Sequence, residues 1–367
     1  CRNIALEEAR QRITTGEAHV IRFKSPREGT TVANDLLRGD IVVENRTIDD
    51  FILVKSDGFA LYHLAATVDD HLMNISHVIR GAEWLPTFPL HVLIHRAFGW
   101  EEPVYIHLSV FLKPSGKGKM SKREAAELEK DGYSIFITDM AAAGYIPEGV
   151  VNWIALMGWS YDAHTEFFQM ADLIEKFSVD RLNPSPAAIN FSKLDHFNGL
   201  HIRALDQADL ARRVKPFLEA AGYTVDDARL LKIMLILQER LGTLDDAVEM
   251  AGFFFKERVT PQPEDLVAKG MTAAESARAA RQARDILSDL DEITPATAEP
   301  PLRDLVTKLD IKPGQLFGIL RVAVTGQKVS PPLFESMEII GRQAVLERLD
   351  AAIELLEQPG QIQPHDE

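Results

Sequence analysis

The spacing of apolar residues changes partway along the chain. From about residue 18 to residue 112, short apolar runs rich in β-branched residues predict strands. These runs are "HVIRF" (19–23), "DIVVENRTI" (40–48), "FILVKSDG" (51–58), "FALYHLA" (59–65), "HVIRG" (77–81) and "PVYIHLSVFL" (103–112). After about residue 123, apolar residues recur three and four positions apart, which predicts helices. The pattern therefore predicts an α/β part followed by an all-α part.

A helix is expected between the last two strands, within "LPTFPLHVLIHRAFGW" (85–100). Thr87 can cap its start and Gly99 can end it. One apolar face is formed by Leu90, Leu93, Ile94 and Ala97. Strand, helix and strand make a crossover unit, so we expect a parallel sheet with ligands at the carboxyl ends of its strands. In the helical part, the Pro-rich segment 292–301 is predicted to be a linker.

Composition limits the class of protein. The 367 residues are 46% hydrophobic, which is enough for a buried core in two or three domains. One cysteine excludes a disulfide framework and favours a reducing cytoplasm, and no apolar run approaches the roughly 20 residues of a membrane span. The first residue is not Met, so we expect the chain to begin inside a longer protein.

A basic loop stands out in an acidic chain. The formal net charge is -15, yet "KPSGKGKMSKRE" (113–124) has five cations before its first acid. Gly116 and Gly118 allow the backbone to approach a ligand, and the lysines suit a triphosphate. The spacing is not that of a Walker P-loop. A phosphate-binding loop and a solvated basic loop both remain open on this segment alone.

Further motifs connect this loop to a family. The stretch "KSDGFALYHLAATVDDHLMNISHVIRGAEW" (55–84) precedes "KMSKR" (119–123). Later come "GYIPEGVVNWIALMGWS" (144–160), "FSKLDHFNGLHIR" (191–203) and "LRVAVTGQKVSPPLFESMEIIGR" (320–342). In this order the motifs resemble those of bacterial-type glutamyl-tRNA synthetases, which are class I aminoacyl-tRNA synthetases. The resemblance covers nearly the whole chain.

The resemblance implies a fold and its division into domains. The fold class is α/β plus all-α: the second half of a Rossmann-type catalytic domain, followed by a helical anticodon-binding region. Residues 1–58 would end the acceptor-binding insertion, and residues 59–112 would form the second half of the Rossmann domain. Residues 113–199 would form a connecting domain with the KMSKR loop, and residues 200–367 the anticodon-binding region.

One family motif has no match in this sequence. Members begin with a part that carries P-x-P-T-G-x-x-H-[IV]-G, whose histidines contact ATP phosphate, and no such stretch occurs here. We therefore expect the isolated chain to form glutamyl-adenylate poorly, because the wall opposite the basic loop is missing. Whether the natural protein also lacks this part stays open.

The resemblance assigns ATP chemistry to the basic loop. Lys119, Lys122 and Arg123 are the candidate catalytic residues, because charge builds on the leaving pyrophosphate. The candidate ATP-binding residues are Lys119, Met120, Ser121, Lys122, Val110, Phe111 and Trp84. Magnesium would accompany ATP.

Arg80 and Tyr62 are the candidate glutamate-binding residues. Arg80 follows the apolar "HVI", and a guanidinium matches a carboxylate with two donors. An ion pair between Arg80 and Glu83 is the competing interpretation. Tyr62 and Trp84 match family positions, although core packing alone would explain both. Ala66 stands where some relatives carry Asn, so a side-chain hydrogen bond is lost there.

No metal site is expected. His91 and His95 are four apart on the predicted helix, but a third ligand is lacking and exposed helix histidines are common. In some relatives a Cys-Arg-x position helps bind zinc, and here Cys1 is followed by Asn3 at the next expected ligand. Zinc is therefore not expected in this chain.

The helical part would contact the anticodon. The resemblance points to Arg240, Arg321, Thr325, Ser330 and Pro331, since RNA bases are bound by stacking, Arg planes and hydrogen bonds. Arg240 would face the third anticodon base, which is C in tRNA for glutamate and G in tRNA for glutamine. Arg240 on the solvent face of an amphipathic helix is the alternative.

The sequence thus predicts a glutamate–tRNA ligase that uses ATP, glutamate and tRNA(Glu). We expect a cytoplasmic monomer without a membrane segment. A non-catalytic tRNA-binding fragment or paralogue is the alternative. Glutaminyl-tRNA synthetases end in β-barrels, and a tRNA-modifying paralogue lacks an anticodon region, so the helical carboxyl-terminal part argues against both. Charging of tRNA for glutamine stays open.

Overall fold

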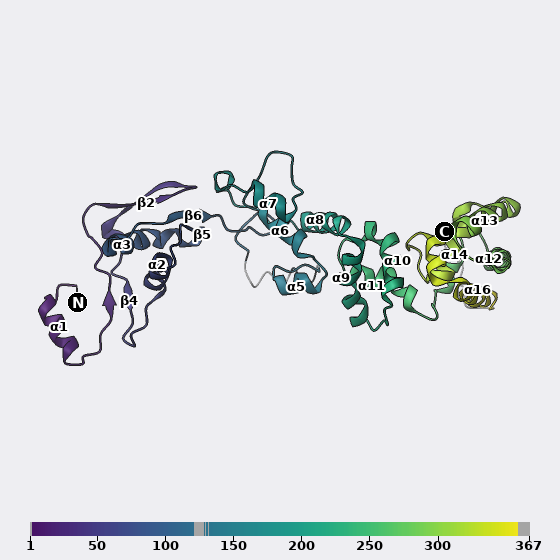
Figure 1. The fold of residues 1–367 in the computed structure, drawn as a ribbon, viewed down its shortest axis with the longest axis horizontal. Coiled ribbons are helices and arrows are strands. Elements are labelled where there is room, and N and C mark those ends of the chain that lie inside the picture. The colour runs from purple at the N-terminus through teal and green to yellow at the C-terminus, as the bar shows by residue number, and fades with distance from the viewer. Residues whose placement is uncertain (1, 121–127, 129, 131, 359–367) are drawn as a thin grey trace. The chain divides into compact units, whose positions relative to one another are not determined.

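The computed structural model describes residues 2–120, 128, 130 and 132–358. The chain forms two compact units, one of Cys1–Lys130 with Asn152–Phe191 and one of Asp131–Val151 with Ser192–Glu367. Figure 1 shows the first unit with its strands and the second with its helices. Among the described residues, no helix has both the length and the apolar composition needed to cross a bilayer.

The first unit contains a four-stranded sheet in the order β3-β2-β6-β5. Its strands are β2 (Thr30–Asp35), β3 (Gly39–Glu44), β5 (His77–Gly81) and β6 (Val104–Leu108). β2, β6 and β5 are parallel, and β3 pairs antiparallel with β2 along a full six-residue register. The three parallel strands therefore end at the same edge of the sheet.

Two helices accompany this sheet. α2 (Tyr62–Leu72) packs against α3 (Phe88–Phe98), and α3 packs against β2. Phe88 and Val92 of α3 are buried with Tyr105 of β6, which anchors the helix on the sheet. Gly99 ends α3 with φ of 69°, as the sequence predicts, because a left-handed residue closes the last turn without a Cβ clash. The predicted crossover unit and parallel pairing are confirmed.

The remaining elements of the first unit are short. They are α1 (Leu6–Thr14), β1 (Ile21–Arg22), η1 (Asn45–Thr47), β4 (Ile52–Val54), η2 (Ala82–Thr87), α7 (Met170–Lys176) and η4 (Val179–Arg181). β1 and β4 form a separate antiparallel pair. The segment that ends at residue 58 contributes β2 and β3 to the same sheet as β5 and β6.

One prediction of secondary structure in this unit was wrong, and one strand was not predicted. The run 59–65 is not a strand, because α2 begins at Tyr62. A short apolar run fits either state, and here tertiary packing against α3 selects the helix. β2 was missed because it holds Ala, Asn and Asp among its six residues, which have low strand propensity, although its exposed and buried positions alternate strictly.

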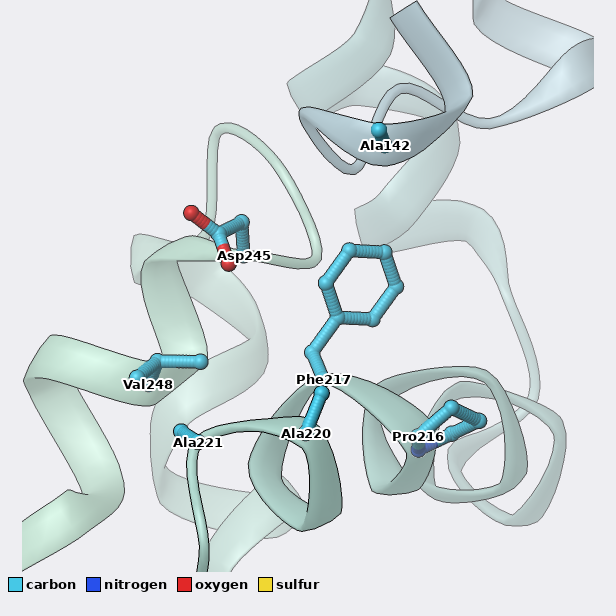
Figure 2. Close-up of a pocket in the computed structure, with 7 residues that line it drawn as sticks. All are labelled: Ala142, Pro216, Phe217, Ala220, Ala221, Asp245 and Val248. Atoms are coloured by element: carbon cyan, nitrogen blue, oxygen red, sulfur yellow. The ribbon is translucent and has the colours of Figure 1, made fainter. Parts of the chain in front are cut away.

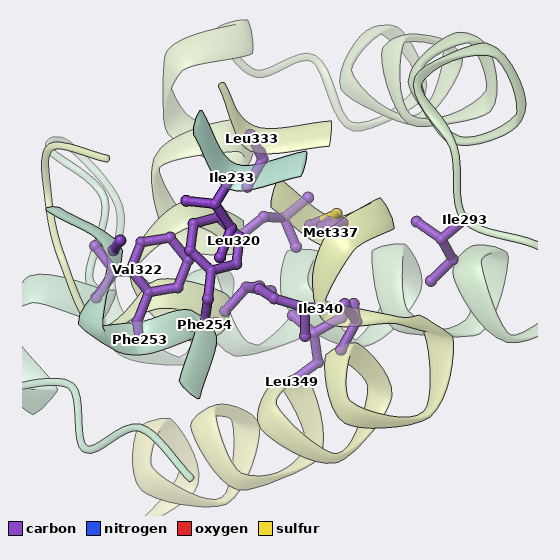
Figure 3. Packing of buried hydrophobic residues seen from close by; sticks show 14 of the residues in the cluster. Ile233, Phe253, Phe254, Ile293, Leu320, Val322, Leu333, Met337, Ile340 and Leu349 are labelled. Carbon is purple, nitrogen blue, oxygen red and sulfur yellow. The ribbon is translucent and has the colours of Figure 1, made fainter. Parts of the chain in front are cut away.

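The second unit is helical and has one large core. Phe253, Phe254, Leu320, Met337 and Leu349 meet in it, as Figure 3 shows. The helices that lie wholly or partly in it are α5 (Ile137–Ala142), α6 (Pro147–Ala155), α8 (Phe191–Ala204), α9 (Gln207–Ala220), α10 (Asp227–Leu237), η5 (Gln238–Arg240), α11 (Asp246–Ala251), η6 (Gly252–Phe255), η7 (Pro263–Leu266), α12 (Ala273–Ser288), α13 (Pro295–Leu309), α14 (Pro313–Thr325), α15 (Leu333–Ile340) and α16 (Arg342–Glu357). The predicted change from an α/β part to an all-α part is confirmed.

The predicted linker at 292–301 is wrong, because most of it begins helix α13. Thr294 caps the helix through a capping box with Thr297, and Pro295 occupies the first turn, where its missing N–H costs nothing. Pro300 and Pro301 lie deeper in the helix, where proline is normally unfavourable. Burial of Ala298, Leu302, Leu305 and Val306 on the opposite face outweighs the hydrogen bonds that the prolines remove.

Candidate functional site

Polar side chains stand at the carboxyl ends of all three parallel strands. Asp35 ends β2, Arg80 lies at the end of β5, and His107 lies near the end of β6. Asp35 and His107 are fully buried, and Arg80 is half-buried. Because neighbouring parallel strands bring their ends together, three residues far apart in sequence converge at one edge.

A chain of hydrogen bonds joins these three side chains. Asp35 Oδ1 accepts from the backbone N–H groups of Leu37 and Arg38, both at 3.0 Å. Asp35 Oδ2 accepts from the backbone N–H of His107 at 2.9 Å and lies 2.7 Å from His107 Nδ1. On the other side of the imidazole, Arg80 Nε donates to Nε2 at 2.9 Å. The carboxylate thereby reaches the guanidinium through one imidazole.

The guanidinium of Arg80 keeps one unused donor. Nη1 lies 3.4 Å from His91 Nε2, and Nη2 is buried without a hydrogen-bond partner in the described part of the chain. Arg80 does not form the ion pair with Glu83 that the competing interpretation requires. Glu83 Oε1 instead lies 3.8 Å from Lys119 Nζ. A buried cationic donor left unpaired is costly, so this position suits an anionic ligand.

Histidines line the same region. His63 Nδ1 lies 3.0 Å from His91 Nε2, and the hydroxyl Oγ1 of Thr67 on α2 lies 3.4 Å from His91 Nδ1. Burial lowers the pKa of His91 to about 3, and the positive charge of Arg80 acts in the same direction. Burial and Arg80 also lower the pKa of His63. These imidazoles are therefore neutral near pH 7 and leave Arg80 as the charge of this group.

The expected exposure of His91 and His95 was wrong, because both are only 1% exposed. They lie on the face of α3 that packs into the first unit. No group of three His, Cys, Asp or Glu with metal-binding geometry occurs in the residues that the structure describes. Cys1, at the position where some relatives bind zinc, lies outside the described residues.

Aromatic rings border the free side of Arg80. Tyr62 and Trp84 stack with ring centroids 4.6 Å apart. The guanidinium carbon of Arg80 lies 5.8 Å from the Trp84 ring and 5.6 Å from the Tyr105 ring, within cation–π range. Tyr62 is 48% exposed, so core packing does not account for its position. Its neighbour Ala66 is half-buried on the same helix α2.

The basic loop starts as a short hairpin. Leu112 bridges Lys119, and Met120 N–H donates to the carbonyl of Phe111 at 3.1 Å. Gly116 and Gly118 both have positive φ, as the tight reversal requires. Lys119 and Phe111 are exposed. Val110 and Met120 are half-buried beside them, while Ser121, Lys122 and Arg123 lie outside the described residues.

The second unit connects the five candidate anticodon residues by hydrogen bonds. Arg240 Nη1 donates to the carbonyl of Ser330 at 3.1 Å. Arg321 Nη1 donates to the Ser330 hydroxyl at 2.6 Å and to the Pro331 carbonyl at 3.0 Å. Thr325 is buried at the end of α14 and donates back to the carbonyl of Arg321 at 2.8 Å. Arg240 is exposed, as its solvent-face alternative requires, but its guanidinium also lies at this turn.

The two arginines carry positive charge without a local counter-charge. Neither forms an ion pair with any described residue, and both reach the same carbonyl, that of Ser330. Burial, and then the charge of Arg240, lower the pKa of Arg321. Arg348 holds the same region from inside, with Nη1 donating to the Val324 carbonyl at 2.7 Å. We call Arg240, Arg321, Ser330 and Pro331 the arginine turn.

The described part of the second unit includes a cavity beside α9 and another beside the end of α14. One of about 450 Å³ lies between α5, α9 and α11, with Phe217 pointing toward Ala142 and Asp245 at its border (Figure 2). Its lining is otherwise apolar and holds no cation, so it does not suit phosphate or glutamate. The other, of about 370 Å³, is bordered by Thr325, Gln327 and Lys256.

Sequence reasoning missed Asp35, His107 and His63. A signal existed for His107, because it stands at the end of an apolar strand just as Arg80 does. Asp35 gave no comparable signal, since β2 itself was not predicted. His63 was hidden by the interpretation of 59–65 as a strand.

Comparison with known families agrees with this arrangement. Residues 1–196 match the model described as tRNA synthetases class I (E and Q), catalytic domain. Residues 209–353 match the model described as anticodon binding domain. The arginine turn lies in the second match, and Asp35, Arg80 and His107 lie in the first.

Several bacterial proteins similar to this chain are glutamate–tRNA ligases. The chain is 42% identical to a glutamate–tRNA ligase of Chloroflexus aurantiacus, over 97% of this chain and 71% of that protein. It is also 42% identical to one of Dehalococcoides mccartyi, over 94% and 70%. A crystal structure of a glutamate tRNA ligase from Elizabethkingia meningosepticum, in complex with its amino acid, superposes with a TM-score of 0.84 at 31% identity, covering 96% of this chain and 72% of that one. The chain therefore belongs to the glutamate–tRNA ligases among the class I tRNA synthetases.

Proposed function

We propose that this protein uses ATP to activate glutamate and transfers it to the 3′ end of tRNA, and that Arg80 binds the glutamate side chain. The observation that carries this proposal is the buried Nη2 of Arg80, which has no partner among the described residues. A carboxylate of glutamate would accept from this donor and neutralise the guanidinium. Arg80 would thus offer this donor to an anionic ligand.

The surroundings of Arg80 favour glutamate over glutamine. A guanidinium only donates hydrogen bonds, so both oxygens of a carboxylate can accept from it, whereas the NH₂ of an amide would face another donor. His91 and His63 lie beside it as neutral groups and contribute no competing charge. The stacked rings of Tyr62 and Trp84 would form the wall of the same pocket.

The reaction proceeds in two balanced steps. The α-carboxylate of glutamate attacks the α-phosphate of ATP and expels pyrophosphate, and a terminal hydroxyl of tRNA then attacks the acyl-adenylate and expels AMP. Lys119, exposed on the loop hairpin, would meet the phosphates, together with Lys122 and Arg123 of the same loop. The ATP would also contact Val110, Phe111, Met120, Ser121 and Trp84. Mg²⁺ would arrive with ATP, held mainly by phosphate oxygens and water.

The helical unit would bind the anticodon through the arginine turn. Arg240 and Arg321 present positive charge there, and Thr325, Ser330 and Pro331 hold the backbone in place. Single-stranded bases bind by stacking on Arg planes and by hydrogen bonds of this kind. The proposed partner is tRNA(Glu), bound by a monomer in the cytoplasm.

Arg80→Met and Arg80→Lys in the full-length protein test the glutamate site. Glutamate-dependent exchange of pyrophosphate into ATP, measured with saturating tRNA present, reports activation of the amino acid. Because Arg80→Met removes a charge-assisted pair, the KM for glutamate should rise about a hundredfold while the KM for ATP changes little. Arg80→Lys keeps the charge but loses the planar geometry, so it should recover part of the loss.

Arg96→Met is the matched control, since Arg96 is an exposed arginine of the same unit that pairs with Glu102. An unchanged glutamate KM in Arg80→Met would contradict the assignment of Arg80. Absence of exchange in the wild-type full-length protein, together with intact tRNA binding, would instead favour the non-catalytic alternative.

A further inference from the structure

We propose that His107 and Asp35 are positioning residues for glutamate binding, which hold the guanidinium of Arg80 with Nη2 turned toward the substrate carboxylate. This inference rests on the proposed role of Arg80. Neither residue is expected to touch the substrate. They act through the hydrogen-bond chain from Asp35 to His107 to Arg80.

Asp35 is fixed in place before it meets His107. Its Oδ1 accepts two backbone N–H groups of the turn after β2, from Leu37 and Arg38. Backbone pairing adds to this, because Leu36 N–H donates to the Tyr105 carbonyl at 2.9 Å. Oδ2 is consequently held at the end of β6 with little freedom. A carboxylate held at both oxygens can only accept, so it dictates which hydrogen its neighbour must offer.

The contact with Asp35 selects one tautomer of His107. Nδ1 must carry the proton, since it lies 2.7 Å from a carboxylate oxygen that accepts. Burial lowers the pKa of His107, while Asp35 acts in the opposite direction, so the ring is neutral near pH 7. Nε2 then has a lone pair and no proton. That lone pair is the acceptor that Arg80 Nε requires at 2.9 Å.

His107 in turn fixes the orientation of Arg80. An arginine side chain has many rotamers, and a bond at Nε determines the plane of its guanidinium. With Nε bound to His107 and Nη1 near His91, the donor left over is Nη2. The side-chain freedom is lost in folding and not in substrate binding, which increases affinity. Arg38 Nε also donates to the backbone carbonyl of His107 at 3.0 Å and steadies the strand end.

A purely structural role is the alternative that the test has to separate. The Asp35–His107 contact also ties β2 to β6, so its loss could simply loosen the sheet edge. A structural role would lower the melting temperature and weaken binding of all substrates alike. A positioning role would raise the KM for glutamate selectively and would depend on the acceptor at Nε2.

Three variants of the full-length protein make this distinction. Asp35→Asn puts a donor opposite Nδ1 and favours the other tautomer, which turns an N–H toward Arg80 Nε. His107→Phe removes the acceptor at similar size. Both should raise the glutamate KM about tenfold or more, with the ATP KM within about twofold, because one hydrogen bond to a charged group is lost. His107→Gln retains an oxygen acceptor and should stay within about threefold of wild type.

His77→Gln is the control, because His77 is an exposed histidine on β5 that bonds only to Ser76 among described partners. Nitrogen-15 NMR of the wild-type protein adds a readout that does not depend on variants folding. His107 should show a protonated Nδ1 and an unprotonated Nε2. A protonated Nε2 at about pH 7 would overturn the inference directly.

The inference and the proposed function fail in different ways. If Arg80→Met raises the glutamate KM but Asp35→Asn and His107→Phe do not, Arg80 binds glutamate without their help and the inference is wrong. Equal losses for glutamate and ATP in those two variants would assign the pair a structural role only. If Arg80→Met itself has no effect on the glutamate KM, the proposed role of Arg80 in glutamate binding is wrong, whatever the other two variants show.

Discussion

Arg240→Ala should reduce the preference for tRNA(Glu) without unfolding the protein. Arg240 is exposed, and Nη1 makes its single described hydrogen bond, to a carbonyl that Arg321 also reaches. The remaining donors of the guanidinium have no described partner. Loss of this bond should therefore lower the free energy of unfolding by no more than about 1 kcal/mol.

The effect on tRNA should be much larger. A guanidinium donates only, so it can meet the acceptors of C, while the larger G would crowd it in the same position. A well-placed contact to a base contributes about 1–3 kcal/mol, or about 5- to 150-fold in affinity. Arg240→Ala should lose this affinity for tRNA that carries C as the third anticodon base. The same tRNA with G in this position should be charged almost equally well by wild type and Arg240→Ala.

The assay is steady-state charging of both tRNAs by the full-length protein at two or more salt concentrations. Arg212→Ala is the control, since Arg212 is an exposed arginine of the second unit that pairs with Asp209. A contact to phosphate in place of a base would weaken both tRNAs equally and lower the slope of log affinity against log salt by about 1. Unchanged preference between the two tRNAs would remove Arg240 from anticodon reading.

Three further changes address stability. Arg348→Leu should lower the free energy of unfolding by about 3 kcal/mol in urea titrations, because three backbone carbonyls lose their donor and two of these hydrogen bonds are buried. Gly144→Ala should cost about 2 kcal/mol or more by the same measurement, since Gly144 has φ of 83° and an added Cβ would lie 2.5 Å from the backbone N of Asp245. Burial lowers the pKa of His91 from 6.5 to about 3 in the folded protein. As the pH falls below about 6.5, His91 is therefore protonated in the unfolded chain but not in the folded protein, and the free energy of unfolding decreases. At about pH 5 this amounts to about 2 kcal/mol, and His91→Phe should flatten the profile between about pH 6.5 and 4.

The strand–helix–strand unit was predictable because its signals are local. Gly99 closes α3, and Arg80 directly follows the apolar residues of β5, so both the parallel pairing and the position of Arg80 followed from neighbours in sequence. Helix α13 was missed for the opposite reason. Its prolines are a strong local signal against a helix, and the burial of one face that overrides them depends on distant packing partners.

The candidate site shows the same difference between local signals and contacts that depend on the fold. Residue type and strand position identified Arg80, but its partners were set by contacts between residues far apart in sequence. Asp35 and His107 are 72 positions apart, and Arg240 and Ser330 are 90 apart. The buried state of His91 and His95 also depends on how α3 packs, which the spacing of the two histidines does not reveal. Side-chain chemistry can be listed from sequence, whereas the pairing of that chemistry follows from the fold.

An acidic protein can bind acidic substrates where its cations lack local partners. The chain carries a formal net charge of -15. Arginines such as Arg213, which pairs with Glu148, have their charge neutralised by a neighbouring carboxylate. Arg80, Arg240 and Arg321 have no carboxylate partner among the described residues and bond to imidazoles or carbonyls instead. Charges beyond about 10 Å are largely screened at ordinary salt, so these local fields matter more than the total. Neutral partners orient a guanidinium without cancelling its charge, and this is the property that binding of both glutamate and an anticodon requires.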